Sequence, residues 1–167
     1  KYIIENINKN LLKKLEILDV GCGGGILCEP LCRLGANVTG IDLNEKAINV
    51  AKNHAKQNKL EINYRNINIS QINNKNFDII TCMEVLEHVD DINHVISHSA
   101  KLLKSGGVFF GSTINKTLSS YLFAIIAAEK IFKILPEKTH VWEKLIKPNT
   151  LKIKFLKNGF YKFHHNG

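Results

Sequence analysis

Short apolar runs alternate with longer segments whose apolar residues have a helical spacing. Runs typical of buried strands occupy residues 15–20, 37–41, 61–65, 77–82 and 108–113. Segments 26–34, 44–55 and 91–103 are expected to be helices, and the second of them places Ile48, Ala51 and Ala55 on one helical face. Strands that alternate with such helices predict an α/β fold with a mainly parallel sheet and helices on both faces. Ligands of such a sheet bind at the C-terminal ends of its strands.

Weaker patterns join and flank these elements. Residues 1–14 carry a nearly helical apolar stripe, and residues 66–76 form a polar connection. Residues 105–107 predict a turn before the fifth strand. Residues 149–158 predict a helix closed by a glycine, followed by a sixth strand at 160–164.

Residues 117–135 are unusually apolar for this chain. Their uninterrupted apolar core, residues 121–128, is far shorter than the roughly 18 residues that a membrane span requires. Three interpretations remain open for this segment. It lies in a membrane interface, covers the site as a lid, or packs as a buried helix.

A glycine-rich loop, GCGGG at residues 21–25, separates the first strand from the first helix. Glycines allow positive φ angles and a close approach of the backbone to a ligand, while free N–H groups at the helix start point into the same space. Asp42 stands at the tip of the second strand, about 20 residues after the first loop glycine. A carboxylate in that place can accept hydrogen bonds from both hydroxyls of a ribose. The pattern predicts a nucleoside-containing ligand.

The spacing of the glycines argues against a dinucleotide. The fingerprint G-x-G-x-x-G requires a small residue at position 26 or 28, where this chain has Ile26 and Cys28. The alternating pattern of Asp19 and the loop glycines instead resembles the first motif of class I methyltransferases that use S-adenosylmethionine (SAM). The loop is therefore expected to bind SAM.

A second group of polar residues follows the fourth strand. Glu84, Glu87 and His88 stand at i, i+3 and i+4, so a helical segment would place all three on one face. Two carboxylates and an imidazole are ligands for Mg²⁺, Mn²⁺ or Zn²⁺. His88 could equally carry a proton without any metal, and solvated residues at a strand end would show the same pattern.

Composition narrows the class of protein. The 167 residues, 44% of them hydrophobic and 23% charged, fit one globular domain. The four cysteines include no C-x-x-C pair and no secretory signal is recognisable, which favours reduced thiols in a cytosol-like compartment. A net charge of +8 favours an anionic partner, unless it reflects only a compositional bias in solvated lysines. No pattern of interleaved basic and aromatic residues indicates RNA binding, so no nucleic-acid partner is expected.

Several segments resemble the O-methyltransferases of ubiquinone biosynthesis, which methylate polyprenyl-catechol and demethylubiquinol intermediates. The resemblance covers nearly the whole chain, and its most specific segments are 81–89 and 112–115, with further matches at 18–27, 38–42, 127–131 and 136–148. It implies a Rossmann-like class I fold in one domain spanning 1–167. It also implies a membrane-associating or lid insertion at about 117–147.

The resemblance also implies the residues of the site. The implied cofactor-binding residues are Asp19, Gly21, Gly23, Asp42 and Met83. A divalent ion, Mg²⁺ or Zn²⁺, would be held by Glu84, Glu87 and His88. Glu84 and His88 are the expected catalytic residues.

The implied partners follow from the implied substrate. They are a polyprenyl-phenol or quinol, an anionic membrane surface and other enzymes of ubiquinone biosynthesis. The implied location is the cytoplasmic side of a bacterial inner membrane or the equivalent matrix face of a mitochondrion. The family has a cofactor-binding arginine upstream of the position of Lys1 and a last strand beyond that of Gly167, so we expect a chain truncated at both ends. The alternative functions are methyl transfer to another small molecule, to nucleic acid or to protein, and a non-catalytic membrane-bound subunit with the SAM fold.

Overall fold

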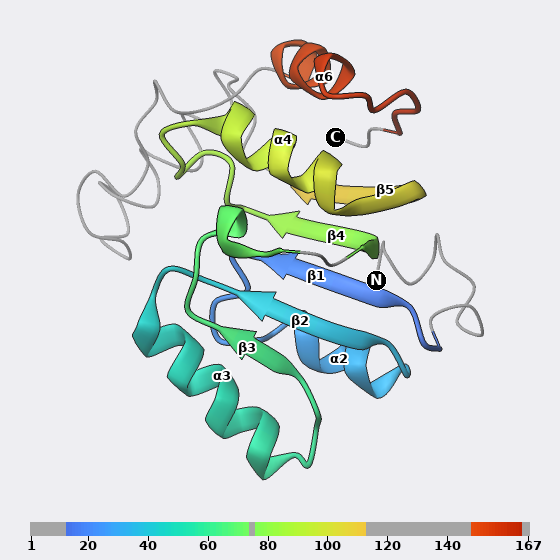
Figure 1. The fold of residues 1–167 in the computed structure, drawn as a ribbon. Helices are drawn as coiled ribbons and strands as arrows, with labels where there is room; N and C mark the ends of the chain where they lie inside the picture. Colours follow the sequence, from blue (N-terminus) through green and yellow to red (C-terminus); the bar gives the residue numbers. More distant parts are fainter. Residues whose placement is uncertain (1–12, 74–75, 113–147, 165–167) are drawn as a thin grey trace, which may run out of the picture.

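A five-stranded parallel sheet forms the centre of the computed structural model, which describes residues 13–73, 76–112 and 148–164. The strands lie in the order β3-β2-β1-β4-β5 (Figure 1). All four neighbouring pairs are parallel. The bounds are Glu16–Val20 for β1, Asn37–Ile41 for β2, Asn63–Arg65 for β3, Phe77–Met83 for β4 and Leu103–Ser112 for β5. The predicted α/β fold and its first five strands are confirmed.

The helices between the strands begin at polar caps where the sequence offers them. Asn44 caps α3 and Asp91 caps α4, each accepting a hydrogen bond from the backbone N–H three residues further on, at 3.2 and 3.1 Å. A short 3-10 helix, η2, lies in the connection before β4, where Ile69 and Ile72 are buried. The helical bounds are Cys28–Arg33 for α2, Glu45–Gln57 for α3, Ile69–Gln71 for η2, Ile92–Leu102 for α4 and Pro148–Lys157 for α6.

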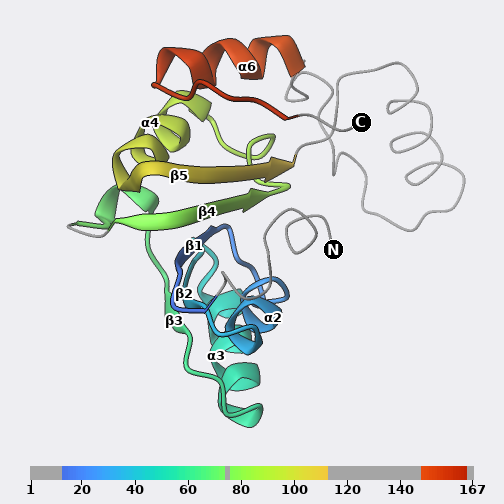
Figure 2. The same ribbon diagram turned by 90° about the vertical axis from the view of Figure 1, so that its right-hand side faces the viewer.

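Both faces of the sheet are covered, because successive apolar residues of a strand point to opposite faces. Ile17 of β1 belongs to the core cluster that includes buried residues of α2 and α3, whereas Leu18 belongs to the cluster that includes those of α4. In the two ribbon views, α2 and α3 lie beside the half of the sheet formed by β1, β2 and β3, while α4 and α6 lie beside β4 and β5 (Figures 1 and 2). The apolar runs that form β1, β2 and β4 are therefore strands buried on both sides, whereas most residues of β3 and β5 keep some exposure.

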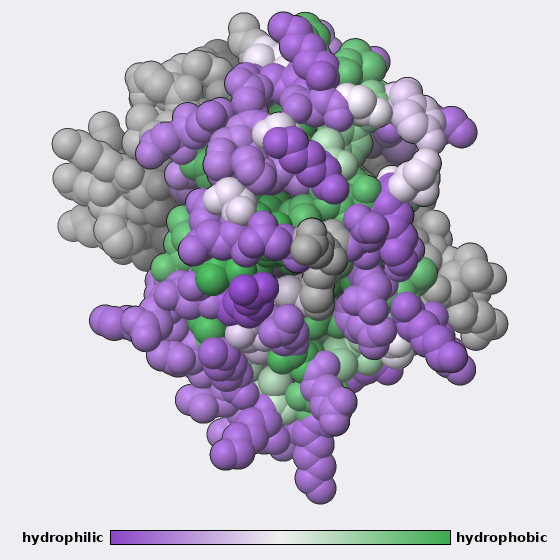
Figure 3. All heavy atoms as spheres, in the orientation of Figure 1, coloured by the Kyte–Doolittle hydropathy of each residue, from purple (hydrophilic) through white to green (hydrophobic). Residues whose placement is uncertain are grey.

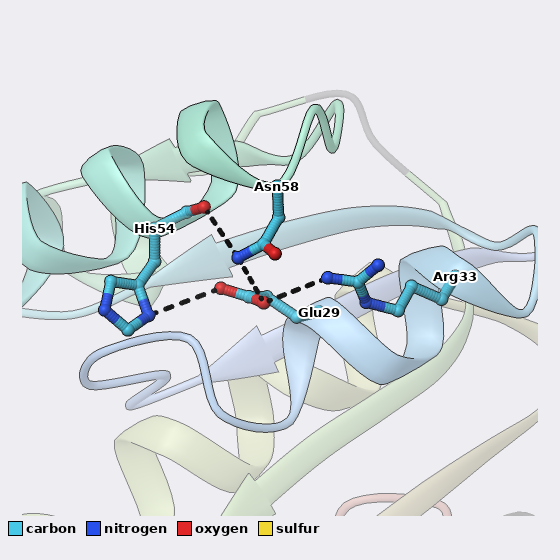
Figure 4. Close-up of polar contacts among 4 residues, drawn as sticks. All are labelled: Glu29, Arg33, His54 and Asn58. Carbon is cyan, nitrogen blue, oxygen red and sulfur yellow. Dashed lines mark hydrogen bonds and ion pairs between the residues drawn. The ribbon is translucent and has the colours of Figure 1, made fainter.

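Glu29 of α2 joins that helix to α3 (Figure 4). Its carboxylate lies 3.8 Å from His54 Nδ1 and accepts a long hydrogen bond, 3.5 Å, from Asn58 Nδ2. Arg33, one turn along α2, lies 3.8 Å from the same carboxylate. These contacts are at the surface, so they orient the two helices more than they stabilise them.

The predicted start of the fifth strand and the predicted sixth strand were wrong. β5 begins at Leu103 and includes the residues expected to form a turn, because Gly106 at φ +78° and a register shift opposite Phe77–Ile79 let the ladder continue around them. Residues 160–164 form no strand in the structure. The rings of Phe160 and Phe163 instead pack on that of Phe155, with centroids 5.0 and 6.4 Å apart.

The expected helix at 1–14 lies almost entirely outside the described residues, as do the apolar segment 117–135 and most of the wider insertion. Within the described ranges, no helix is long and apolar enough to cross a membrane. All four cysteines have free thiols, as expected. Long hydrophilic side chains project from the face shown in Figure 3, and hydrophobic residues gather in its middle.

Candidate functional site at the C-terminal edge of the sheet

The glycine loop turns at the end of β1 and is tied to β2. The N–H groups of Gly21 and Cys22 both donate to the carbonyl of Ile41, at 2.8 and 3.0 Å. Gly21, Gly23 and Gly25 all have positive φ, as a loop of this tightness requires. A Cβ on Gly23 would have no atom within 4 Å, so the loop presents bare backbone to open space there. That surface suits the close approach of a ligand.

Asp42 lies directly beside this loop, as its place at the tip of β2 predicts. Its Oδ2 accepts a hydrogen bond of 2.8 Å from the Gly23 N–H, and its Oδ1 accepts one of 2.8 Å from the Asn44 N–H. Asn66 donates to the Asp42 carbonyl at 2.9 Å and steadies the same turn. A carboxylate offers about four acceptor positions, so about two remain for the two hydroxyls of a ribose. The loop and Asp42 therefore fit the adenosyl part of SAM.

Asp19 occupies a different environment, underneath the loop. It is 3% exposed, and its carboxylate accepts hydrogen bonds from Thr81 Oγ1 at 2.6 Å and from Cys28 Sγ at 3.3 Å. Burial raises the pKa of Asp19 to about 6, against the lowering effect of these two hydrogen bonds. Asp19 thus connects β1 to β4 and to α2 from inside the protein. The sequence alone did not indicate Thr81 or Cys28 as its partners.

Tyr64 is a second residue that sequence reasoning missed. Its ring lies against two glycines, since a Cβ on Gly40 would come within 2.8 Å of ring carbons and one on Gly25 would collide with the hydroxyl. Burial raises the pKa of the Tyr64 hydroxyl, which has no hydrogen-bond partner among the described residues. The ring supports the loop from β3. The only sequence signal was the glycines that make room for it.

The segment after β4 is a tight turn. A helical segment would place the three side chains on one face, but here the His88 N–H closes a single turn, donating to the Val85 carbonyl at 2.9 Å. Glu84 has φ +55°, which no helix residue adopts. The condition that would place Glu84, Glu87 and His88 on one helical face is therefore not met. Positive φ directly after a strand cannot be recognised from the residue types, because glutamate rarely adopts it.

The three expected metal ligands differ in exposure. Glu87 is 3% exposed and neither of its carboxylate oxygens has a hydrogen-bond partner within the described part of the chain, whereas Glu84 and His88 are exposed. A buried carboxylate without a partner is costly unless a proton or a cation compensates it. Among the described residues, however, no three His, Cys, Asp or Glu side chains come together as a metal site. Two carboxylates and an imidazole are suitable ligands for a divalent ion, but the described structure does not bring these three side chains together.

The glycine loop and this turn lie next to each other. The space that a Cβ on Gly21 would occupy is taken by a methyl group of Val85, which stands between Glu84 and Leu86. Met83, the last residue of β4, is 39% exposed at the same edge. The structure therefore places the glycine loop, Asp42 and the turn after β4 at the same edge of the sheet, whereas Asp19 lies beneath the loop and Glu87 is buried.

Comparisons with known proteins agree with this arrangement. Residues 18–111 match the family model described as a methyltransferase domain. The crystal structure of the magnesium protoporphyrin IX methyltransferase of Synechocystis with bound SAH is similar, with 26% identity, a TM-score of 0.73 and coverage of 95% of this chain and 68% of that one. A SAM-dependent methyltransferase of Clostridium acetobutylicum has 27% identity and a TM-score of 0.62, with coverage of 78% and 51%.

Curated relatives are much more similar in sequence. A ubiquinone biosynthesis O-methyltransferase of Pelagibacter ubique is 52% identical over 160 residues, covering 90% of this chain and 67% of the relative. The corresponding protein of Colwellia psychrerythraea is 50% identical over 152 residues, covering 89% and 62%. The chain thus spans about two thirds of the length of these relatives.

The parallel sheet, the glycine loop and the acidic residue that ends β2 define a methyltransferase domain of the Rossmann-like class I type. Within this class, the chain belongs to the family of ubiquinone biosynthesis O-methyltransferases.

Proposed function

We propose that the protein transfers a methyl group from SAM to a phenolic hydroxyl of a polyprenylated catechol or demethylubiquinol intermediate. The observation that carries this proposal is the contact of Val85 with Gly21. It joins the loop suited to the adenosyl group to the turn that carries two carboxylates and an imidazole. The names of the relatives and the bound SAH of the Synechocystis structure support the substrate class and the cofactor.

The loop residues bind and orient the cofactor. The bare backbone at Gly23 allows close approach, and the remaining acceptor positions of Asp42 take the ribose hydroxyls. Met83 is exposed beside them and offers an apolar contact. When bound, SAM supplies an electrophilic methyl group that a nucleophile displaces in line. The main contribution of the protein is therefore alignment of the two reactants.

The turn residues act on the acceptor. A phenol with a pKa near 10 is mostly protonated at neutral pH, so a base that takes its proton makes it a better nucleophile. His88 and Glu84 are exposed at the edge and are the groups proposed to take that proton. We also propose that Glu84, Glu87 and His88 hold a divalent ion, which when bound would lower the pKa of a coordinated phenol. The unpartnered carboxylate of Glu87 supports this ion.

A methyl-transfer assay tests the proposal directly. The protein is incubated with labelled SAM and a short-chain demethylubiquinol, with and without a chelator. We expect labelled product, loss of turnover on chelation and recovery with Mg²⁺ or Zn²⁺. Replacing His88 with Ala should lower kcat on the order of a hundredfold, because a positioned base is removed.

A matched histidine provides the control. His54 on α3 is also exposed and pairs with Glu29 of α2 (Figure 4) instead of belonging to the turn after β4, so His54→Ala should retain the parent rate. Full activity in metal-free protein would show that no ion takes part. Absence of labelled product despite SAM binding would contradict the proposed acceptor.

The location and partners are proposed on the same basis. We propose that the protein works at an anionic membrane surface, on the cytoplasmic face of an inner membrane or the equivalent mitochondrial face, beside other enzymes of ubiquinone biosynthesis. A substrate with a polyprenyl tail resides in the bilayer, and the net charge of +8 favours anionic lipid.

A further inference from the structure

We propose that Ser112 is a positioning residue that holds the Glu84 carboxylate in place at the reacting edge of the sheet. This inference rests on the proposed function, in which Glu84 acts on the acceptor. Ser112 is the last residue of β5 and pairs with Met83, the last residue of β4. The register therefore places Ser112 directly beside the residue that precedes Glu84.

Three contacts join the two residues. Ser112 Oγ donates a hydrogen bond of 2.5 Å to Glu84 Oε1. The same hydroxyl oxygen accepts from the Glu84 N–H at 3.2 Å, and the Ser112 carbonyl accepts from that N–H at 3.1 Å. One side chain thus holds both the backbone and the carboxylate of Glu84.

The conformation of Glu84 indicates why such a clamp is needed. Its φ of +55° is disfavoured for a residue with a side chain and persists only where neighbouring groups determine it. The residue is also exposed, and an exposed glutamate ordinarily samples many rotamers. The hydroxyl of Ser112 removes that freedom before any ligand arrives.

The geometry leaves Glu84 able to react. A hydrogen bond to Oε1 occupies one acceptor position, so Oε2 remains available to a phenol proton or to an ion. Carboxylates that bind ions or protons in active sites are themselves held by a second hydrogen bond, and losing that support typically costs about 10- to 100-fold in affinity or rate. Ser112 fills this supporting role.

Ser112→Ala is a clean test, because it removes the hydroxyl and keeps the backbone contact between the Glu84 N–H and the Ser112 carbonyl. We expect kcat for methyl transfer to fall about tenfold while the KM for SAM and the melting temperature stay unchanged. Ser112→Thr retains a hydroxyl and should restore the rate. Ser105→Ala, the same change at the exposed opposite end of β5, is the matched control.

A second readout does not depend on turnover. Mn²⁺ binding is measured in the absence of SAM from the electron paramagnetic resonance signal of the free ion. The affinity for Mn²⁺ should fall about tenfold in Ser112→Ala and stay unchanged in Ser105→Ala. Weaker Mn²⁺ binding in a protein that methylates no phenol would support the inference and contradict the proposed function. Parent-like kcat and Mn²⁺ binding in Ser112→Ala would overturn the inference, as would equal losses of SAM affinity and thermal stability. A parent protein that neither binds Mn²⁺ nor transfers methyl groups would overturn both.

Discussion

At the scale of single residues, burial separates the two aspartates of the loop region. Asp42 has accessible surface and keeps acceptor positions for a ligand, whereas Asp19 is 3% exposed and uses its carboxylate within the protein. The same type of side chain thus remains open to a ligand at one position and supports the loop from inside at the other. The difference arises because Asp19 belongs to β1, whereas Asp42 lies just beyond the end of β2.

Replacing Asp19 with Asn should change how stability depends on pH. The pKa of Asp19 is about 6 in the folded protein and 3.8 as its ordinary value, so the folded state binds more protons between these values. Ionised Asp19 therefore destabilises the folded protein. This destabilisation is absent below about pH 4 and complete above about pH 6. Relative to the parent, Asp19→Asn should gain up to about 3 kcal/mol over this interval. Urea unfolding at several pH values measures the difference.

Asp78 serves as a control, because its effect on the pH dependence of stability has the opposite sign. Its burial would raise its pKa, but hydrogen bonds from Lys104 Nζ at 2.8 Å and the Glu16 N–H at 2.9 Å lower it instead. The stability that Asp78 contributes is present above the pKa that its carboxyl has in the unfolded chain. It is lost as pH falls through the lower pKa of that carboxyl in the folded protein. The stability of Asp78→Asn should therefore fall further below that of the parent as pH rises. Parallel curves for Asp19→Asn and the parent would contradict the argument for Asp19.

At the scale of elements, α6 is attached by one buried aromatic residue and by the partly buried Leu151, which packs against the core cluster that includes residues of α4. Phe155 is its buried residue, and its ring centroid lies 4.9 Å from that of Phe109 on β5. Lys154 adds a hydrogen bond of 3.1 Å from its Nζ to Asn93 Oδ1 on α4. The outward residues Ile153 and Leu156 contribute little, because they remain about half exposed.

Phe155→Ala should therefore destabilise the protein by about 3–5 kcal/mol, the range for truncating a buried phenylalanine. Hydrogen exchange should show the α6 amides losing protection before those of β4. Leu156→Ala is the neighbouring control and should cost about 1 kcal/mol or less, because that side chain is 49% exposed. Equal effects of the two substitutions would mean that Phe155 does not attach the helix.

At the scale of the whole molecule, charge and the apolar segment bear on the proposed membrane partner. The chain carries 23 basic and 15 acidic residues. Basic proteins bind anionic lipid through an electrostatic attraction that salt screens, and apolar side chains add affinity by entering the interface. Membrane binding of this protein should thus depend on both salt and residues 117–135.

We expect the protein to pellet with phosphatidylglycerol vesicles and much less with phosphatidylcholine vesicles, and raising the salt concentration should weaken binding. Replacing Ile125 and Ile126 with Glu should release the protein while SAM affinity stays intact. Ile153→Glu places the same change at an exposed isoleucine of α6 and should retain binding. Unchanged pelleting of the double variant would exclude the segment as the membrane contact.

Local patterns determined most of the secondary structure. The bounds of β2 agree with the apolar run at 37–41, and Asn44 and Asp91 begin their helices as polar caps do. The glycine spacing and the position of Asp42 likewise predicted a loop and a carboxylate that the fold joins through the Gly23 N–H. These features depend on neighbouring residues, so their signals are short-range and visible in the sequence.

Contacts between distant residues decided the rest. The turn at Glu84 depends on Ser112, 28 residues away, and the environment of Asp19 depends on Thr81, 62 residues away. The residues 160–164 had the composition of a strand but pack as aromatic side chains on Phe155. A strand forms only beside a second strand, a buried carboxylate such as that of Asp19 requires a hydrogen-bond donor, and the strained turn at Glu84 requires groups that hold it. The sequence by itself determined the elements and the ligand loop, whereas only the tertiary structure supplied these partners.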